Sequence, residues 1–563
     1  MASFHGFDER IADAHRHIVS LWPSLTRRDE PGEGNRIPLP YPYVMPSTDK
    51  FPHLFYWDSY FTIVGLAVDG QRELVRSMVE NFLYELREFG LALNYNHPAS
   101  LTRSQPPYLT SMIKEALKGG LDTQSVAADG PVRLDKRPQQ AAATEHGDPL
   151  KLDLDWLREA FGLAKREYEE VWLGRHDTPI GLCRYADPGN PDSERRAQWE
   201  SGWDFSSRWG GRCHHLAAVD LNCNLYRYEL DFAQFAELLG EPEEAKLWRA
   251  RAEERRRRIL RYLYDPKQGL FFDYDFVEGR LMDDRPSLAA FHPLFVGLAT
   301  PEEAAGVVEK LRLFEHPGGL ACTVENYPVP HDAAQEGPEF AGPFQWDYPN
   351  GWAPLHWVAV CGLKNYGYFE EAARIALKWL TLCADLLVQT GAMWEKYNVV
   401  ERNLEVTTDY PNQRGFGWTN GVYSALLGKA IMGLDYDVAR RRAVVEPLFC
   451  PTLAGREFSA RFQGYLGDEV AINVSSAPDL RHQALSLRAS PPFPLLEVRL
   501  RDYFPRDPVR VTVNGAPHPH RRERRPYHTV VVELEDAAEM ELRADWTAGQ
   551  PTQPNQPSPA SVG

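Results

Sequence analysis

The feature that most constrains the fold is a series of amphipathic stripes with helical spacing, which occupies roughly the first 435 residues of the 563-residue chain. Stripes of this kind run through 70–87, 154–173, 221–239, 248–264 and 369–387. Between the stripes at 221–239 and 248–264, Gly240-Glu-Pro-Glu predicts a short turn. No sequence unit repeats at a fixed period, which argues against a plain helical-repeat array. We therefore expect a mainly α fold built as a helical barrel or solenoid. In the stripe at 70–87 the apolar positions are Leu74, Val75, Met78, Val79, Phe82, Leu83 and Leu86.

After about residue 437 the pattern becomes that of a small β domain. Four segments alternate apolar and polar residues, and Asn514-Gly515 is a strong hairpin signal. We predict a catalytic helical domain at 1–437, a β-sandwich-like domain at 438–546 and a Pro/Gln/Ser-rich tail at 547–563 that cannot bury enough apolar area to fold. The segment 119–149, rich in Gly, Pro, Ala and Gln, is expected to be a long loop, either a lid or a tolerated surface insertion.

Charge and composition exclude several classes of function. The formal charge is −17, which disfavours nucleic acid and anionic lipid as partners, and no apolar run is long enough to span a membrane. Seven cysteines lie without a CxxC pair, and the N-terminal residues show no secretory signal, so we expect a cytoplasmic protein with reduced thiols. No Walker loop, no GxGxxG and no GxSxG occurs, and Cys213-His-His215 lacks further metal ligands at suitable spacing. We expect no cofactor and no metal.

Five clusters between the helical stripes combine aromatic residues with carboxylates and amides. A sugar ring offers apolar faces that stack on Trp and Tyr, and hydroxyl groups that bind carboxylates, amides and Arg. Loops of this kind that meet at one end of a barrel form a binding site. The clusters are Phe55–Phe61, Glu200–Trp209, Gln345–Pro354, Trp394–Tyr397 and Asp409–Gly421.

Four carboxylates in these clusters each stand next to a tryptophan: Asp58, Asp204, Asp347 and Glu395. Hydrolysis of a glycoside needs two such carboxylates, one on each side of the scissile bond. A single Trp-Asp pair is more often a core tryptophan beside a helix-capping carboxylate. Four such pairs in one chain, with Arg103-Ser-Gln105 available as further polar residues, favour a carbohydrate-active hydrolase.

At these residues the chain resembles the trehalases, inverting glycoside hydrolases that split α,α-trehalose into two glucoses. QWDYPNGWAP at 345–354, ESGWDFSSRW at 200–209, EKY at 395–397 and GFGWTNG at 415–421 match family motifs. Lesser matches are RSQPP at 103–107, VDLN at 219–222 and FDYD at 272–275, so the resemblance spans about 40–435 in family order. It implies an (α/α)6 barrel followed by a β domain that lies outside the resemblance.

The resemblance also implies roles for individual residues. Asp204 takes the position of the general acid and Glu395 that of the general base, which in an inverting enzyme stand about 6.5–9.5 Å apart. Gly202 matches a position where the backbone approaches the sugar, and Asp409 stands where the family has Glu. The full set of expected substrate-binding residues is Lys50, Phe51, Trp57, Asp58, Asn94, Arg103, Ser104, Gln105, Gly202, Trp346, Asp347 and Asp409.

Part of the substrate-holding set departs from the family. Lys50 replaces a substrate-binding Arg, and a Lys ammonium cannot form the bidentate contacts of a guanidinium. His53 replaces a Glu, and a second family Arg has no clear counterpart in the shortened segment 186–196, where Arg195 or Arg196 is a candidate. A glycine-rich stretch of the family is replaced by 399–408.

Three hypotheses follow. The first is a cofactor-free inverting trehalase acting on a small sugar, with Asp204 as acid and Glu395 as base. The second is an inverting α-glycosidase for another small glucoside, an oligosaccharide or a glucosylated solute, suggested by the changes at Lys50, His53 and 186–196. The third is a sugar-binding protein without hydrolytic activity, which would be expected to have lost one of the two carboxylates. The sequence does not indicate an oligomeric state.

Overall fold

The computed structural model describes residues 2–29, 35–118, 152–325, 344–408 and 410–547. In this part helices dominate up to residue 431 and strands dominate from residue 434 onward. The predicted helical stripes are confirmed, because each coincides with one helix or with a helix and its continuation. They are α3 (Arg72–Glu88), α5 (Leu154–Arg166) with its π-helical continuation Glu167–Leu173, α7 (Val219–Leu238), α8 (Pro242–Leu263) and α13 (Phe369–Thr390).

Two kinds of helix follow from two kinds of sequence. In α2 (Tyr56–Val68) and α12 (Ala353–Asn365) nearly every residue is apolar or small, and nearly every residue is buried. In α8 the buried residues form a single stripe that includes Trp248, Ala252 and Ile259, and charged residues occupy the rest of the surface. A helix that is apolar on all sides lies inside a larger assembly, whereas one with a single apolar stripe covers it from outside.

The buried helices contact one another in a cycle. Each helix packs against the next, and the last packs against the first. Around them lie α1 (Glu9–Leu25), α3, α5, α8 and α13, each packed on one or two members of the cycle. The members, in order, are α2, α4 (Leu109–Leu117), α7, α9 (His292–Phe295), α12 and α14 (Gly417–Ala425).

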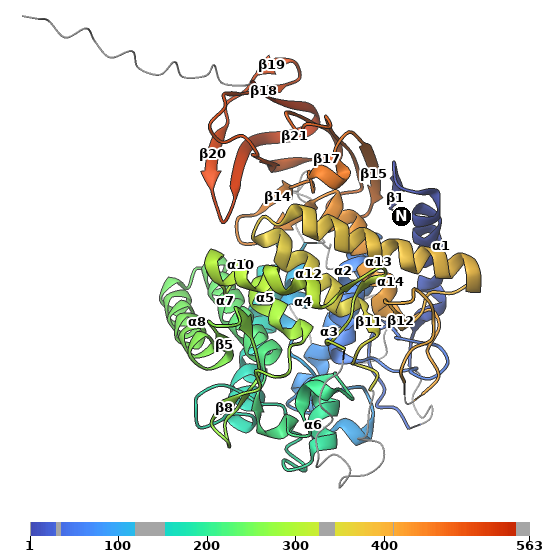
Figure 1. Cartoon of the computed structure of the whole chain (residues 1–563), viewed down its shortest axis with the longest axis vertical. Helices are drawn as coiled ribbons and strands as arrows, with labels where there is room; N and C mark the ends of the chain where they lie inside the picture. The colour runs from blue at the N-terminus through green and yellow to red at the C-terminus, as the bar shows by residue number, and fades with distance from the viewer. Residues whose placement is uncertain (1, 30–34, 119–151, 326–343, 409, 548–563) are drawn as a thin grey trace, which may run out of the picture.

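A mostly antiparallel sheet sits at one end of the helical region, in orange and red at the top of Figure 1. Its centre is a pair of long strands, β17 (His482–Arg501) and β21 (His528–Trp546), whose register shifts between Arg488 and Phe493. On one side of β17 lie β16 (Glu469–Ser476) and β15 (Glu457–Gln463), and β14 (Arg442–Val445) pairs with β17 in parallel. Asn514 and Gly515 both have positive φ in the turn between β18 (Val509–Val513) and β19 (Ala516–Pro517), so the predicted hairpin is confirmed.

The sheet also takes strands from outside the segment 438–546. β1 (Ser3–His5), at the N-terminus, pairs with Ser459–Arg461 of β15. β13 (Leu434–Asp437) pairs with β14 directly after the last helical turn. Strands β1 and β13 therefore belong to the sheet although they lie outside 438–546. The division of the chain into domains at 437 and 438 stays a prediction. The expected loop at 119–149 and all but residue 547 of the expected tail lie outside the described residues.

Among the described residues, no helix is both long and apolar enough to cross a membrane. Within the same residues, no three His, Cys, Asp or Glu side chains gather in a way that would hold a metal ion. Cys213 and His214 are buried in a short helical turn, where the His214 ring nitrogen Nδ1 lies 2.9 Å from Glu194.

Helices α2 and α14, neighbours in the cycle, approach each other closely. A β-carbon added at Gly65 would overlap the backbone of Gly421, and one added at Gly421 would overlap the backbone of Phe61 and Thr62. Backbone cannot move aside as a flexible side chain can, so only glycine fits at either position. The two helices can therefore pack backbone to backbone, which fixes how α2 is placed.

We expect Gly65→Ala to lower the free energy of unfolding by at least about 2 kcal/mol, because the added methyl group has no space between the two backbones. Urea unfolding followed by circular dichroism measures the change. The matched control is Gly162→Ala in α5, where an added β-carbon meets nothing within 4 Å. There the substitution is expected to be neutral or to stabilise by up to about 1 kcal/mol. Equal effects of the two changes would contradict the proposed tight contact.

Candidate active site

A cavity of ≈ 530 Å³ opens among loops and helix starts that are far apart in the sequence. Its lining comes from residues 50–58, 94–105, 196–204, 345–352, 395 and 410–418. All five aromatic and carboxylate clusters singled out from the sequence contribute to it. The lining has a wall of tryptophans, a group of carboxylates and a rim of cationic and imidazole side chains.

The tryptophan wall is built from rings that support one another. Trp346 stacks on Trp352, with ring centroids 4.0 Å apart and planes 3° apart, and it also lies 5.6 Å from Trp57. Trp418 packs edge-on against all three at 5.4 to 6.1 Å. These four rings are buried, so their orientation is fixed by packing, and they give the cavity an apolar wall.

Asp204 follows the end of α6 (Glu194–Ser201). The helix ends because Gly202 takes a left-handed conformation with φ of 72°. At this position a β-carbon would lie 2.6 Å from the Trp57 ring, so glycine allows the loop to pass directly over the indole. Asp204 is half-buried, and its backbone carbonyl accepts a hydrogen bond from the Gln345 side-chain amide.

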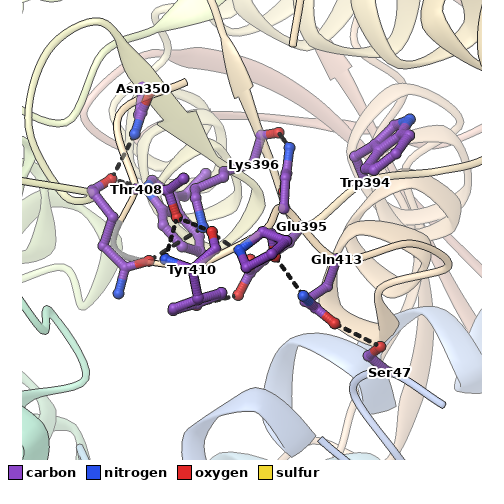
Figure 2. A network of polar contacts seen from close by, with 12 residues as sticks. Ser47, Asn350, Trp394, Glu395, Lys396, Thr408, Tyr410 and Gln413 are labelled. Carbon is purple, nitrogen blue, oxygen red and sulfur yellow. Dashed lines mark hydrogen bonds and ion pairs between the residues drawn. The ribbon is translucent and has the colours of Figure 1, made fainter. Parts of the chain in front are cut away.

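Glu395 lies at the start of a short ribbon and is 2% exposed. The Lys396 ammonium donates to its Oε2 at 2.9 Å, and the Tyr410 hydroxyl donates to its Oε1 at 2.6 Å (Figure 2). The Glu395 backbone N–H donates to the Gln413 carbonyl at 2.9 Å. The ribbon pairs β12 (Lys396–Asn398) with β11 (Asn350–Trp352), which joins two of the sequence motifs directly.

Asp58 stands in the first turn of α2 and faces the same cavity. Burial raises the pKa of its carboxyl well above the usual range, and the negative charges of Glu395 and Asp204 act in the same direction. All three carboxyl groups are therefore close enough to interact electrically. This arrangement is typical of a site that handles protons.

Two arginines line the cavity from segments that precede the Glu395 loop in the chain. Arg103 and Arg196 both contact Asp187 Oδ2, at 3.6 Å and 2.8 Å, and Arg103 lies 5.2 Å from the centroid of Trp199. Asp187 is buried, and its pKa is lowered by hydrogen bonds from its neighbours, including Arg196, and by the charge of Arg103. Arg196 is thus one of the two arginines that sequence analysis left open.

The rim carries Lys50 and His53, two of the departures from the family pattern. The exposed Lys50 ammonium lies 3.4 Å from the centroid of the Tyr410 ring, a cation–π contact. His53 packs edge-on against Tyr95 and His97. Burial and the nearby charge of Arg36 lower the pKa of His53 to about 4, so the imidazole is neutral at physiological pH.

Most of the expected site residues come together in this cavity. Two do not line it among the described residues: Ser104, whose hydroxyl donates to the Ala92 carbonyl, and Asp347, whose carboxylate accepts from Ser206 and Ser207. Asp409 lies outside the described residues. Those that line the cavity are Lys50, Phe51, Trp57, Asp58, Asn94, Arg103, Gln105, Gly202, Asp204, Trp346 and Glu395.

Several other residues line the cavity that were not among the expected site residues. Some belong to the motifs already recognised, so their position in those motifs was the available signal. Others lie in loops whose sequence has no distinguishing pattern. The additional residues are His53, Phe55, Tyr95, His97, Ala99, Arg196, Trp199, Gln345, Trp352, Tyr410, Phe416 and Trp418.

The helical fold and a cavity that joins stacked tryptophans with buried carboxylates define a carbohydrate-active hydrolase. Residues 5–430 match the trehalase family. The chain belongs to the trehalase family and is a glycoside hydrolase. It is 35% identical over 456 residues to the periplasmic trehalase of Pseudomonas aeruginosa, covering 74% of this chain and 77% of that protein.

A solved trehalase structure agrees with this assignment. The neutral trehalase from Saccharomyces cerevisiae superposes with a TM-score of 0.54 at 27% identity, covering 73% of this chain and 79% of that one. An α-L-rhamnosidase from Dictyoglumus thermophilum, 13% identical, superposes with a TM-score of 0.57 over 97% of this chain and 50% of its own. At that identity the likeness concerns the fold alone, and its coverage includes the C-terminal sheet as well as the helices.

Gly202→Ala is expected to displace the Trp57 ring and to change the near-ultraviolet circular dichroism, because its methyl group would overlap the indole. A left-handed alanine by itself costs about 1 kcal/mol. Gly211→Ala is the matched control, since Gly211 has the same φ of 72° and an added β-carbon there meets nothing within 4 Å. A near-ultraviolet spectrum of Gly202→Ala that matches the Gly211→Ala spectrum would argue against the contact with Trp57.

Proposed function

We propose that this glycoside hydrolase is an inverting α,α-trehalase in which Asp204 is the general acid and Glu395 the general base. The observation that carries the proposal is the meeting of both carboxylates at one cavity, in motifs shared with the family. The names of the relatives from Pseudomonas aeruginosa and Saccharomyces cerevisiae support trehalose as the substrate.

The chemistry assigns a different task to each carboxyl group. Asp204 donates a proton to the glycosidic oxygen as the bond breaks, and Glu395 removes a proton from the water that attacks the anomeric carbon on the opposite face. The tryptophan wall stacks against a sugar face. Asp58, with its raised pKa, provides a carboxyl group whose proton can be donated to a sugar hydroxyl.

We also propose that the cycle of buried helices forms an (α/α)6 barrel. The support is the order of contacts, in which α2, α4, α7, α9, α12 and α14 pack in sequence and α14 returns to α2. A barrel of this kind places the loops at one end next to one another, in line with a cavity lined from six separate segments. Figure 1 shows α6, which precedes the Asp204 loop, at the end of the helical region away from the sheet.

A second candidate substrate class is another small α-glucoside. It is favoured by Lys50, which packs on the Tyr410 ring at the rim, and by His53, whose neutral imidazole occupies a position held by Glu in the family. These side chains offer one ammonium and one imidazole in place of a guanidinium and a carboxylate. The set of hydroxyl partners at this rim therefore differs from that of the family.

We further propose a cytoplasmic location. All seven cysteines are free, and six of them are buried, which suits a reducing compartment. The named location of the Pseudomonas aeruginosa relative is the periplasm, so the compartment needs its own test. The test is a gentle release of the periplasmic contents from intact cells. Retention of the protein inside the treated cells would support the proposal, and its appearance in the periplasmic fraction would reject it.

Proton NMR of the purified protein with trehalose tests substrate and stereochemistry together. An inverting trehalase is expected to release equal initial amounts of α- and β-glucose, because only the sugar that is attacked changes configuration. An initial excess of α-glucose would reject inversion. No glucose from trehalose, with hydrolysis of other α-glucosides such as maltose or kojibiose, would favour the second substrate class.

Asp204→Asn and Glu395→Gln are each expected to reduce kcat by a factor of at least ~10² to 10⁴, the usual contribution of a general acid or base. Asp283→Asn and Glu401→Gln are matched controls, because both side chains are exposed and lie outside the cavity lining. Steady-state kinetics on trehalose measure the effect. Activity of either catalytic-pair variant within threefold of the controls would remove that residue from its role.

A further inference from the structure

The carboxylate of Glu395 is held by one cation that does not line the cavity. Lys396 is fully buried, and its ammonium donates to Glu395 Oε2 at 2.9 Å. Among the described residues, Glu395 is the carboxylate with which Lys396 forms an ion pair. The ammonium lies 4.9 Å from the centroid of the Trp352 ring and 4.3 Å from that of Tyr410, so it is enclosed by aromatic faces.

The same ammonium reaches toward the other catalytic loop. Lys396 Nζ donates to Gln345 Oε1 at 3.1 Å, and the Gln345 Nε2 group donates to the backbone carbonyl of Asp204. A continuous path of hydrogen bonds therefore runs from Glu395 through Lys396 and Gln345 to Asp204. Each link joins a donor to an acceptor, so the orientation of the Gln345 amide is fixed by both neighbours.

Gln345 is itself firmly anchored. Its backbone carbonyl accepts from the Asn350 side chain and from the Trp352 indole, each at 2.9 Å. Asn350 and Trp352 belong to β11, which pairs with the strand that begins at Lys396. Both inner members of the path, Gln345 and Lys396, are therefore anchored to the ribbon of β11 and β12. The path can hold the two loops at a fixed separation.

We infer that Lys396 and Gln345 form a strut that sets the position of Glu395 relative to Asp204, with Lys396 as a positioning residue for the reaction. This rests on the roles proposed above for the two carboxylates. An inverting hydrolase needs space for one water between base and sugar, and a displacement of 1 Å can cost a factor of ~10² in rate. The tyrosine on Oε1 holds the second oxygen, so the carboxylate is restrained on both sides (Figure 2).

The test compares Lys396→Met with Lys396→Arg in kinetics on trehalose and on α-D-glucopyranosyl fluoride. We expect Lys396→Met to reduce kcat by about 10²-fold with KM within threefold of the wild type. Fluoride leaves without protonation, so a defect of the acid becomes smaller on the fluoride, whereas a defect in activating water persists. The loss in Lys396→Met should therefore persist on the fluoride, and Lys396→Arg, which keeps the cation, should recover at least tenfold of it.

The matched control is Lys429→Met. Lys429 is also a buried lysine that pairs with a carboxylate, but its partner Glu115 does not line the cavity, whereas Glu395 does. Replacement of Lys429 is expected to lower thermal stability and to leave kcat of the folded enzyme unchanged. If Lys396→Met behaves in the same way, the strut is rejected and Lys396 has a structural role only.

Two further variants keep the outcome clear. If Lys396→Met does not fold, Gln345→Met takes its place. This change removes the side-chain hydrogen bonds of Gln345 to Lys396 and to Asp204, and it keeps the ion pair between Lys396 and Glu395. A kcat of Gln345→Met less than threefold below that of the wild type would reject the strut. Glu395→Gln is measured in the same assays. An active Glu395→Gln would overturn the proposed function, whereas an inactive Glu395→Gln with an unaffected Lys396→Met would overturn the strut alone.

Discussion

The close approach of α2 and α14 at Gly65 and Gly421 is the contact on which the geometry of the site depends. α2 carries Trp57 and Asp58 in its first turn, and α14 carries Trp418 in its own. Because the two backbones touch, the rings and the carboxyl group at the helix starts have fixed relative positions. A wider separation would open the tryptophan wall, since Trp57 and Trp418 are in edge-on contact.

The loops that carry the two catalytic carboxylates are held by different means. The segment after Asp204 is fastened to the segment 345–347 by Asp347, which accepts from the Ser207 backbone and hydroxyl and from the Ser206 hydroxyl. The segment at Glu395 is fastened to the same region by the ribbon of β11 and β12. The loop 345–352 is therefore the common support of both. Burial raises the pKa of Asp347, while the serine hydrogen bonds oppose this effect.

The sequence was sufficient to predict five helices before residue 431, namely α3, α5, α7, α8 and α13, and the strands of strongest alternation after it. Helical stripes and alternation are local patterns, and the elements formed where these patterns are strong, as at α3, α7 and α13. The pairing of Ser3–His5 with β15 could not be predicted, because three residues carry no pattern and their partner lies more than 450 positions away. The same holds for the cycle of buried helices, whose order depends on contacts between distant segments.

The site was predictable to the extent that its residues belong to motifs. Asp204, Glu395, Trp57 and Asp58 were found in this way, and they face one cavity. Asp347 stands in an equally strong motif, yet its partners are serines of another loop, which no local pattern reveals. Arg196 lines the cavity from a segment that differs from the family, and Tyr410 lies in a cluster that was recognised without a role for this residue. Only the fold shows that these two side chains reach the site.

The strand at Ser3–His5 has a consequence for how the protein is made. Its partner, β15, is synthesised about 450 residues later, and α1, which directly follows the strand, packs against α13 and α14. During translation β1 and α1 therefore leave the ribosome well before the segments that they pack against. They can complete the native structure only after those later segments have been made, although they precede them in the chain.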